Sequence, residues 1–241
     1  MLISEYLSNV ELYFSEESIP TNGSFAFSGE EVKHITKVMR HSVGDVLYFT
    51  SGLGSIVKTE ISFIEKYSIE LTILEEFHYT NPLEHITLCL PMLRSKERME
   101  FAIEKAVELG FTSFQFIAYD STVKKEINLE RVKKITQSAL TQSLRAYLPK
   151  LGAPIVLSEN VKLAGTHIVF DQSGMKQTTE TLRNMINKSE KIFLYFGPEG
   201  GFSQREFELF RKNKSELVKL TENRLRAETA ILSALSIIAI F

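Results

Sequence analysis

The sequence predicts an α/β protein in two parts, a small β-rich domain followed by a mainly parallel sheet with helices on both faces. Residues 1–77 contain short runs of β-branched and aromatic residues separated by glycine-containing turns, a pattern typical of a small barrel. From residue 78 onward, apolar runs alternate with segments of helical periodicity, which indicates strands connected by helices. The polar, proline-containing stretch at 78–82 separates the two patterns. We therefore expect domains at 1–77 and 78–241.

The first part is expected to contain several strands and one helix. Its clearest strands are Val46–Thr50, Ser55–Phe63 and Ser68–Leu74, where β-branched and aromatic residues dominate. Turns rich in glycine separate these runs. Glu30–Arg40 interrupts them with apolar residues at helical spacing, so a barrel with one helix is predicted.

In the second part, periodicity and capping residues define each element. Apolar residues from Met99 to Val107 recur at helical spacing, and Gly110 is placed to end that helix. Ser203 and Glu206 have the spacing of a capping box and open another helix. The expected strands are 86–90, 114–119, 167–170, 191–196 and 216–220, and the expected helices are 95–109, 129–147, 178–186, 203–212 and 226–240.

The composition is that of an ordinary globular protein. Of the 241 residues, 44% are hydrophobic and 24% are charged, which excludes disordered and low-complexity classes. The single Cys89 cannot form an intrachain disulfide, and no Cys or His group has zinc spacing, so no metal is expected. We find neither a signal-peptide pattern nor an apolar run of membrane length. A cytoplasmic protein without a membrane partner is therefore expected.

Charge is distributed unevenly along the chain. Residues 1–76 carry 5 Lys and Arg against 12 Asp and Glu, whereas residues 77–241 carry 23 against 18, for a net charge of −2. Any RNA-binding surface is thus expected to be local or to lie mainly in the second part.

Common catalytic motifs are absent from the sequence. There is no P-loop, no dinucleotide-binding G-x-G-x-x-G, no G-x-S-x-G nucleophile motif and no H-E-x-x-H. The five histidines are scattered along the chain, and histidines in such isolation are more often structural than catalytic. We assign none of them a catalytic role.

Two polar loops follow apolar strands and are candidates for a binding site. The loop GPEGGFS at 197–203 can bring its backbone close to a ligand, although a loop of this kind taken alone is more often a tight turn. The loop before the last helix gathers Arg224, Arg226 and Glu228, which taken alone would indicate a surface ion pair. That last helix is nearly free of polar residues, so one of its apolar stripes could contact a second subunit.

A third candidate segment lies at 138–151. Gln142, Ser143 and Arg145 place hydrogen-bond donors for phosphate or a base edge at one end of a helix, with Tyr147 nearby for stacking. A solvated helix face would have a similar composition, so both readings stay open for this segment alone.

Taken together, these segments resemble the RsmE family of SPOUT-class RNA methyltransferases. The most specific matches are GPEGGFS at 197–203 and LRAET at 225–229. The supporting matches are RMEFAIEKAVELG at 98–110, STVKK at 121–125, QS-x-R at 142–145 and HITKVMRHSVGD at 34–45, the last resembling the PUA-like N-terminal domain of the family. The resemblance covers nearly the whole chain.

The resemblance implies a fold, a reaction and partners. The C-terminal part would contain a deep trefoil knot, the protein would be a homodimer, and the cofactor would be S-adenosylmethionine. The reaction would be methylation of N3 of one uridine in small-subunit (16S) rRNA, either free or in the assembled small ribosomal subunit. DNA is not an expected partner.

The resemblance also implies roles for individual residues. Arg226 is expected to stabilise the anion of the uridine, and Glu228 to orient Arg226 or to act as a base. The expected cofactor-binding residues are Phe196, Gly197, Pro198, Glu199, Gly200, Gly201, Leu220, Thr221, Asn223, Leu225, Arg226, Thr229 and Ala230. The expected RNA contacts are Lys37, Arg40, Lys124, Gln142 and Arg145.

Two other functions stay open. A non-catalytic RNA-binding protein of ribosome assembly could keep the same scaffold, but a damaged cofactor loop would be expected, and GPEGG and RAET are intact. A SPOUT methyltransferase acting on tRNA or on a ribose 2′-OH is the second alternative. The PUA-like first domain favours methylation of a base at N3.

Overall fold

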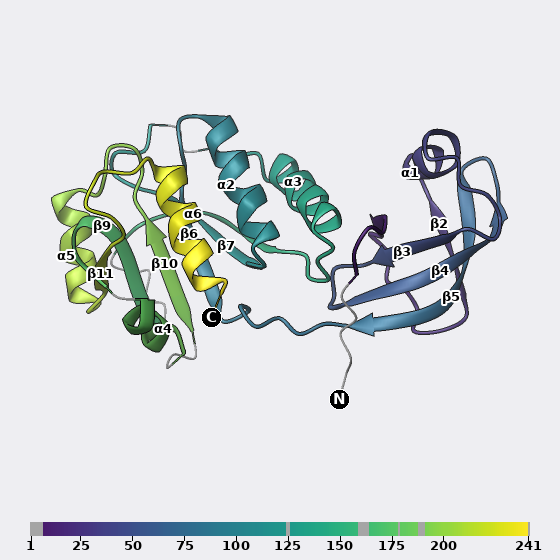
Figure 1. Cartoon of the computed structure of the whole chain (residues 1–241). Helices are drawn as coiled ribbons and strands as arrows, with labels where there is room; N and C mark the ends of the chain where they lie inside the picture. Colours follow the sequence, from purple (N-terminus) through teal and green to yellow (C-terminus); the bar gives the residue numbers. More distant parts are fainter. Residues whose placement is uncertain (1–6, 124–125, 159–163, 178, 188–190, 241) are drawn as a thin grey trace. The chain divides into compact units, whose positions relative to one another are not determined.

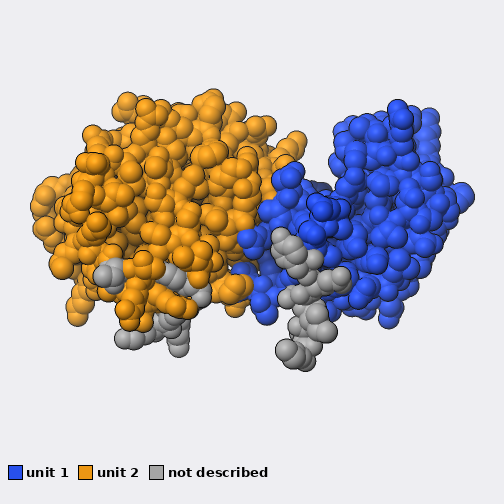
Figure 2. All heavy atoms as spheres, viewed as in Figure 1, with its two compact units in different colours: residues 1–81, 140–148 blue, residues 82–139, 149–241 orange. Residues whose placement is uncertain are grey.

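The chain folds into two compact units in the computed structural model (Figures 1 and 2). The structure describes all residues except 1–6, 124–125, 159–163, 178, 188–190 and 241. Unit 1 comprises residues 1–81 and 140–148, and unit 2 comprises residues 82–139 and 149–241. The division thus differs from a single boundary near residue 78, because 140–148 lie with the first unit.

Unit 1 is built on a five-stranded sheet in the order β1-β3-β4-β5-β2. Its strands are β1 (Leu12–Phe14), β2 (Ser24–Ser28), β3 (Val46–Thr50), β4 (Ser55–Ile64) and β5 (Ser68–His78). β1 pairs with β3 in parallel, and the other neighbours are antiparallel. The helical segment predicted at 30–40 forms a short α1 (Glu31–Lys33) that continues as the π-helical η1 (His34–Val38).

The core of unit 1 is aromatic and centres on Phe49. The rings of Tyr13, Phe25 and Phe27 lie with their centroids 5.4, 5.8 and 4.9 Å from that of Phe49. Val32 of α1 is fully buried in the same cluster. This packing explains why a short helix interrupts the strands, since it closes the apolar face of the sheet.

Residues 140–148 complete unit 1 by contacting the β3–β4 loop. The Leu148 amide donates to Gly52 O and the Gly54 amide donates to Ala146 O, both at 2.9 Å. A Cβ on Gly54 would lie 2.5 Å from the Tyr147 hydroxyl, so glycine is required for this close approach. The predicted helix 129–147 is therefore wrong at its end: α3 (Leu129–Gln142) stops before Leu144, whose φ is 54°.

Unit 2 contains a six-stranded sheet in the order β11-β9-β10-β6-β7-β8. All described pairings in it are parallel, as the alternation of strands and helices predicts. The strands are β6 (Ile86–Pro91), β7 (Ser113–Ala118), β8 (Lys150–Val156), β9 (Thr166–Lys176), β10 (Ile192–Phe196) and β11 (Glu216–Lys219). β8 is a strand that the sequence analysis missed.

Helices cover both faces of this sheet (Figure 1). On one face, Leu209 and Phe210 of α5 (Gln204–Lys212) pack on Phe193 and Tyr195 of the fully buried central strand β10. On the other face, α6 (Ala227–Ile238) contacts β10 and α2 (Lys96–Glu108). Another helix of this unit, α4 (Thr179–Asn187), also contacts α6.

The capping residues behave as the sequence predicts. Ser203 and Glu206 form a reciprocal capping box at the start of α5. Gly110, with a φ of 93°, follows α2, and Ser95 caps the start of that helix by accepting from the Arg98 amide. Across the described residues, no helix is both long and apolar enough to span a membrane.

Candidate functional site

A cavity of about 350 Å³ lies in unit 2 where loops leave the carboxyl ends of β10 and β11. Ligands bind at this edge in parallel α/β sheets. The cavity is lined by Arg98, Phe170, Asp171, Gln172, Gly197, Pro198, Glu199, Gly201, Leu220, Arg224, Leu225, Arg226, Ala227 and Ala230. Four chain segments far apart in the sequence therefore meet at one site.

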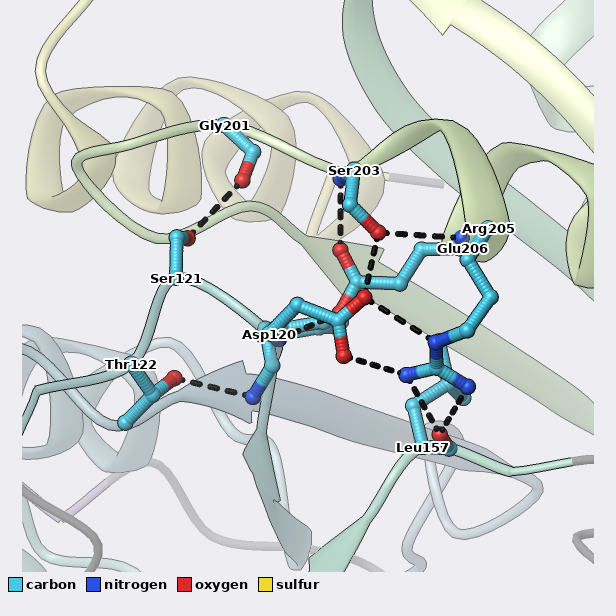
Figure 3. A network of polar contacts seen from close by, with 9 residues as sticks. Asp120, Ser121, Thr122, Leu157, Gly201, Ser203, Arg205 and Glu206 are labelled. Carbon is cyan, nitrogen blue, oxygen red and sulfur yellow. Dashed lines mark hydrogen bonds and ion pairs between the residues drawn. The ribbon is translucent and has the colours of Figure 1, made fainter.

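The glycine loop 197–203 forms one wall of the cavity. A Cβ added to Gly200 would lie 2.9 Å from the Cβ of Ser121, and Gly201 has a φ of 72°. Both positions therefore require glycine, one for space and the other for its backbone conformation. The Ser121 hydroxyl also donates to Gly201 O at 3.1 Å, which holds the loop from the side of β7 (Figure 3).

A buried carboxylate fixes the end of this loop (Figure 3). Glu206 has 0% exposure, and its two side-chain oxygens accept from the backbone amides of Asp120 and Ser203, each at 2.7 Å. One side chain therefore satisfies two backbone donors on segments that are distant in the sequence. Without this carboxylate, two backbone donors beside the glycine loop would lose their hydrogen-bond acceptor.

Asp120 adds a second set of contacts to the same region (Figure 3). Its carboxylate accepts from Ser203 Oγ at 2.5 Å and from Arg205 Nε at 3.0 Å. The guanidinium of Arg205 in turn donates to Leu157 O at 3.2 Å, after β8. The segments after β7 and β8 are thus tied to the start of α5, directly after the glycine loop.

Glu199 is held at both its side chain and its backbone. Its Oε1 accepts from the Arg94 amide at 3.0 Å, and its carbonyl oxygen accepts from Arg224 Nη2 at 3.0 Å. The first bond joins the glycine loop to the segment after β6, and the second joins it to the loop before α6. Glu199 therefore ties the glycine loop to two other segments, of which the one with Arg224 also lines the cavity.

The charged residues at the start of α6 lie at the cavity and in an ion pair with α2. Arg226 is the N-cap residue of α6, is exposed, and lines the cavity. Glu228 lies 3.5 Å from Arg98 Nε through its Oε1, while its Oε2 is buried without a hydrogen-bond partner. The expected contact between Glu228 and Arg226 is therefore replaced by one between Glu228 and Arg98.

The expected cofactor-binding residues cluster around this cavity. Eight of them line it: Gly197, Pro198, Glu199, Gly201, Leu220, Leu225, Arg226 and Ala230. Phe196 is fully buried at the end of β10. Gly200, Thr221, Asn223 and Thr229 belong to the same loops and to the first turn of α6, but they are not among the lining residues.

Several lining residues were missed by the sequence analysis. Asp171 and Gln172 follow the apolar run of β9, at the point where the pairing with β11 is interrupted. Polar residues directly after an apolar run predicted the other two loops of the site. The same signal could have predicted Asp171 and Gln172. Arg98 comes from α2 and is brought to the site only by tertiary packing.

The candidate RNA contacts lie elsewhere in the chain. Lys37 and Arg40 belong to unit 1, and so do Gln142 and Arg145, because residues 140–148 fold with that unit. All four are exposed. Lys124 lies outside the described residues. The second part of the chain therefore supplies one basic residue, Arg145, to the first unit, which is acidic by sequence.

The single cysteine is not available for chemistry at the site. Cys89 is buried in β6, and burial raises the pKa of its thiol well above the ordinary value. The described residues include no group of three or more His, Cys, Asp or Glu side chains with an arrangement that could hold a metal ion. The groups that line the cavity are instead backbone, apolar, guanidinium and carboxylate groups.

Comparison with known families assigns both parts of the chain. A sequence profile described as an RNA methyltransferase domain matches residues 80–239. A profile described as an RNA methyltransferase PUA domain matches residues 27–74. The two matches correspond to the parallel sheet of unit 2 and to most of the sheet of unit 1.

Individual proteins are similar over nearly the whole length. Ribosomal RNA small subunit methyltransferase E of Bacillus subtilis is 27% identical, with 95% of this chain and 96% of that protein covered. The protein of the same name from Aquifex aeolicus is 28% identical, over 96% and 100%. The crystal structure of ribosomal RNA small subunit methyltransferase E from Neisseria gonorrhoeae, bound to S-adenosyl methionine, has a TM-score of 0.80, 26% identity, and coverage of 95% and 96%. The predicted SPOUT-type α/β fold with a PUA-like first domain is thereby confirmed.

Proposed function

The chain belongs to the RsmE family of SPOUT-class RNA methyltransferases, and from this premise we propose that it methylates N3 of one uridine in small-subunit rRNA. S-adenosylmethionine would be the methyl donor, since the similar Neisseria protein binds it. The observation that carries the proposal is that the two loops that match the family, 197–203 and 220–229, line the same cavity.

The residues around the cavity fit S-adenosylmethionine. Apolar side chains such as Phe170, Leu220 and Leu225 would hold the adenine ring, and the backbone of the glycine loop would bind its polar edge. Charged side chains, including Asp171 and Arg224, would bind the hydroxyl, ammonium and carboxylate groups. When bound, S-adenosylmethionine supplies a methyl group on a positively charged sulfur.

The chain's own residues would align the reactants and stabilise charge. Direct methyl transfer needs no covalent intermediate on the protein, in agreement with a buried and weakly acidic Cys89. Uridine N3 carries a proton at neutral pH, and its removal leaves an anion spread over O2, N3 and O4. Arg226 at the cavity would stabilise this anion, because its guanidinium is planar and always charged. Glu228 forms an ion pair with Arg98, so it would position the Arg98 guanidinium at the wall of the cavity.

Unit 1 would bind RNA through its PUA-like fold, Lys37, Arg40, and Gln142 and Arg145 of segment 140–148. Arg145→Ala should lower the affinity for small-subunit rRNA and make the dependence of affinity on salt shallower by about one in the log–log slope. Binding assays from low to moderate salt, with Glu208→Gln on α5 as a control in the other unit, measure both effects. An unchanged salt slope would remove Arg145 from the RNA contacts.

The proposed reaction is tested by mass spectrometry of nucleosides from small-subunit rRNA of cells with and without the gene. We expect N3-methyluridine to be lost without the gene and restored in vitro by the protein with S-adenosylmethionine. If a different methylated base or a ribose methyl group is lost instead, the protein is still assigned as a methyltransferase, but its target is not N3 of uridine. If no modification changes in rRNA or tRNA, a non-catalytic RNA-binding role is favoured.

The in vitro rescue also shows which form of the substrate the protein methylates. Free small-subunit rRNA and assembled small subunits from the deleted strain are offered to the protein in parallel. We expect methylation of one uridine in at least one of the two forms, and the rates identify the better substrate.

The nearly apolar α6 suggests a homodimer. In size-exclusion chromatography, a homodimer would elute at twice the mass of the 27.5 kDa chain.

A further inference from the structure

The basic residues of the acidic first part of the chain are gathered in two segments of unit 1. Of the five Lys and Arg residues among residues 1–76, Lys33, Lys37 and Arg40 lie in or directly after α1 and η1, and Lys66 lies at the tip of the β4–β5 hairpin. Lys58 in β4 is the fifth. Most of the positive charge of an acidic unit is therefore local.

Two of these lysines converge on one exposed aromatic ring. Lys33 Nζ lies 5.5 Å from the centroid of the Tyr67 ring, and Lys66 Nζ lies 5.0 Å from it. Tyr67 is 54% exposed, and both lysines are exposed as well. Lysine side chains are flexible, so the ammonium groups can move aside when a planar group approaches the ring. None of the three residues belongs to the segment 34–45 that resembles the family.

The charge of these two lysines is not neutralised by a carboxylate. Lys105 also lies over a ring, 5.9 Å from the centroid of Phe101, but its ammonium group contacts the carboxylates of Glu104 and Glu108 at 2.6 and 2.7 Å. Neither of the two lysines beside Tyr67 forms an ion pair with any residue that the structure describes. Like charges held at one ring repel each other, and a bound anion relieves that repulsion. The surroundings of Tyr67 therefore favour an anionic ligand.

The tip of the hairpin is held in a fixed position. The Glu65 amide donates to Ser68 O, and the Ser68 hydroxyl donates to Glu65 Oε2, both at 2.8 Å. The Gly29 amide donates to Tyr67 O at 3.2 Å, so the tip lies beside the loop before α1 (Figure 1). Val32 of α1 is fully buried in the core of unit 1 and anchors this helix. The ring and the backbones of both lysines are thus preorganised, which lowers the entropic cost of binding.

An exposed aromatic ring beside ammonium groups has the composition of a site for single-stranded nucleic acid. In such sites a base stacks on the ring, and basic side chains contact the phosphates next to it. Bases in a duplex are already stacked on their neighbours, so a paired segment would gain the phosphate contacts alone. Lys37 follows Lys33 by four residues, about one helical turn, and would extend the contacts along the RNA backbone. An unpaired segment of RNA therefore fits this surface better than a duplex does.

We propose that Tyr67, Lys33 and Lys66 form a platform that binds an unpaired segment of small-subunit rRNA, with a base stacked on Tyr67 and phosphates held by the two lysines. The platform lies in unit 1 and shares no residue with the cavity of unit 2, so it would act on the affinity for RNA and not on the methyl-transfer step. This inference rests on the proposed function, since it adds a contact for the RNA of that reaction.

Stacking is tested by the binding of two RNAs to Tyr67→Ala. One RNA is a duplex taken from small-subunit rRNA, and the other is the same duplex with a short unpaired extension. We expect Tyr67→Ala to bind the extended RNA about tenfold more weakly than the unaltered protein does, and to bind the duplex with the same affinity. Tyr67→Phe keeps the ring and is the matched control, for which both affinities should stay unchanged. Equal affinity of Tyr67→Ala and the unaltered protein for the extended RNA overturns the inference.

The lysines are tested by the salt dependence of binding to the extended RNA. Lys33→Gln and Lys66→Gln should each make the log–log slope shallower by about 0.7, the value for one phosphate contact of a single strand. Lys58→Gln removes the same charge from β4 of the same unit and should leave the slope unchanged. If neither Lys33→Gln nor Lys66→Gln changes the slope, the platform does not bind RNA.

Methyl transfer separates this inference from the proposed function. At saturating RNA and cofactor, we expect Tyr67→Ala to react at the rate of the unaltered protein, whereas at low RNA concentration its rate should fall with its affinity. Normal binding to free rRNA together with slower methylation of assembled small subunits would indicate a protein partner and overturn the inference. Absence of methylation by the unaltered protein contradicts the proposed function instead, and the binding measurements still decide whether the platform exists.

Discussion

Replacing Arg226 by alanine is expected to reduce the rate of methyl transfer by on the order of 10²–10³-fold while cofactor affinity changes only a few fold. Arg226 precedes α6 and lines the cavity, and its guanidinium forms no ion pair or hydrogen bond with the other described side chains. It is therefore available to a developing negative charge. Single-turnover rates and calorimetric titration with S-adenosylhomocysteine measure the two quantities separately.

Arg224→Ala is the matched control, because Arg224 lines the same cavity but donates to Glu199 O. Its loss should weaken cofactor binding more than it slows the chemical step. Arg226→Lys should recover part of the rate, since it keeps the charge without the planar donor pair. If Arg226→Ala loses affinity and rate to the same extent, the residue binds the cofactor and does not stabilise the base anion.

Glu206→Gln should destabilise the protein by about 1–3 kcal/mol, because a buried glutamine offers only one carbonyl oxygen to two backbone donors. Its NH₂ group would face the amide of either Asp120 or Ser203. The glycine loop ends at Ser203, so the affinity for S-adenosylhomocysteine should fall several fold as well. Urea unfolding and calorimetric titration of the same protein preparations measure the two effects.

Glu208→Gln provides the control for this change, since Glu208 is exposed on the same helix. It makes the same chemical substitution without removing a buried acceptor, and we expect stability and affinity to stay unchanged. If Glu206→Gln loses stability but binds cofactor normally, the carboxylate supports the fold alone. Equal stability of the two variants would contradict the hydrogen-bond account.

Much of the fold could be predicted because periodicity and caps are local signals. β3 and β10 appear where runs such as Val46–Thr50 predict them, and the capping box of Ser203 forms as its spacing indicates. β8 was missed because Lys150–Val156 is an edge strand with no fully buried side chain, so its composition is mixed. The end of α3 was misplaced because contacts with Gly52 and Gly54 are long-range.

The site could be predicted where its residues follow a strand in sequence, and not where packing brings them in. The loops around Gly197 and Arg226 carry unusual polar residues after apolar runs, and both line the cavity. Arg98 lies on a helix whose pattern indicates only burial of one face, and its pairing with Glu228 depends on the contact between α2 and α6. The bond from the Asp120 amide to Glu206 and the contacts of the Asp120 carboxylate are likewise invisible without the fold, whereas the capping box of Glu206 is local.

The passage of residues 140–148 through unit 1 has a consequence for biosynthesis. Domains generally fold from the amino terminus as the chain is made. Here the loop containing Gly52 and Gly54 gains its partners Ala146 and Leu148 only after two strands of the second sheet, β6 and β7, have been translated. The amino-terminal unit therefore cannot mature ahead of its neighbour, and cutting the gene at codon 81 would yield a domain that lacks part of its own structure.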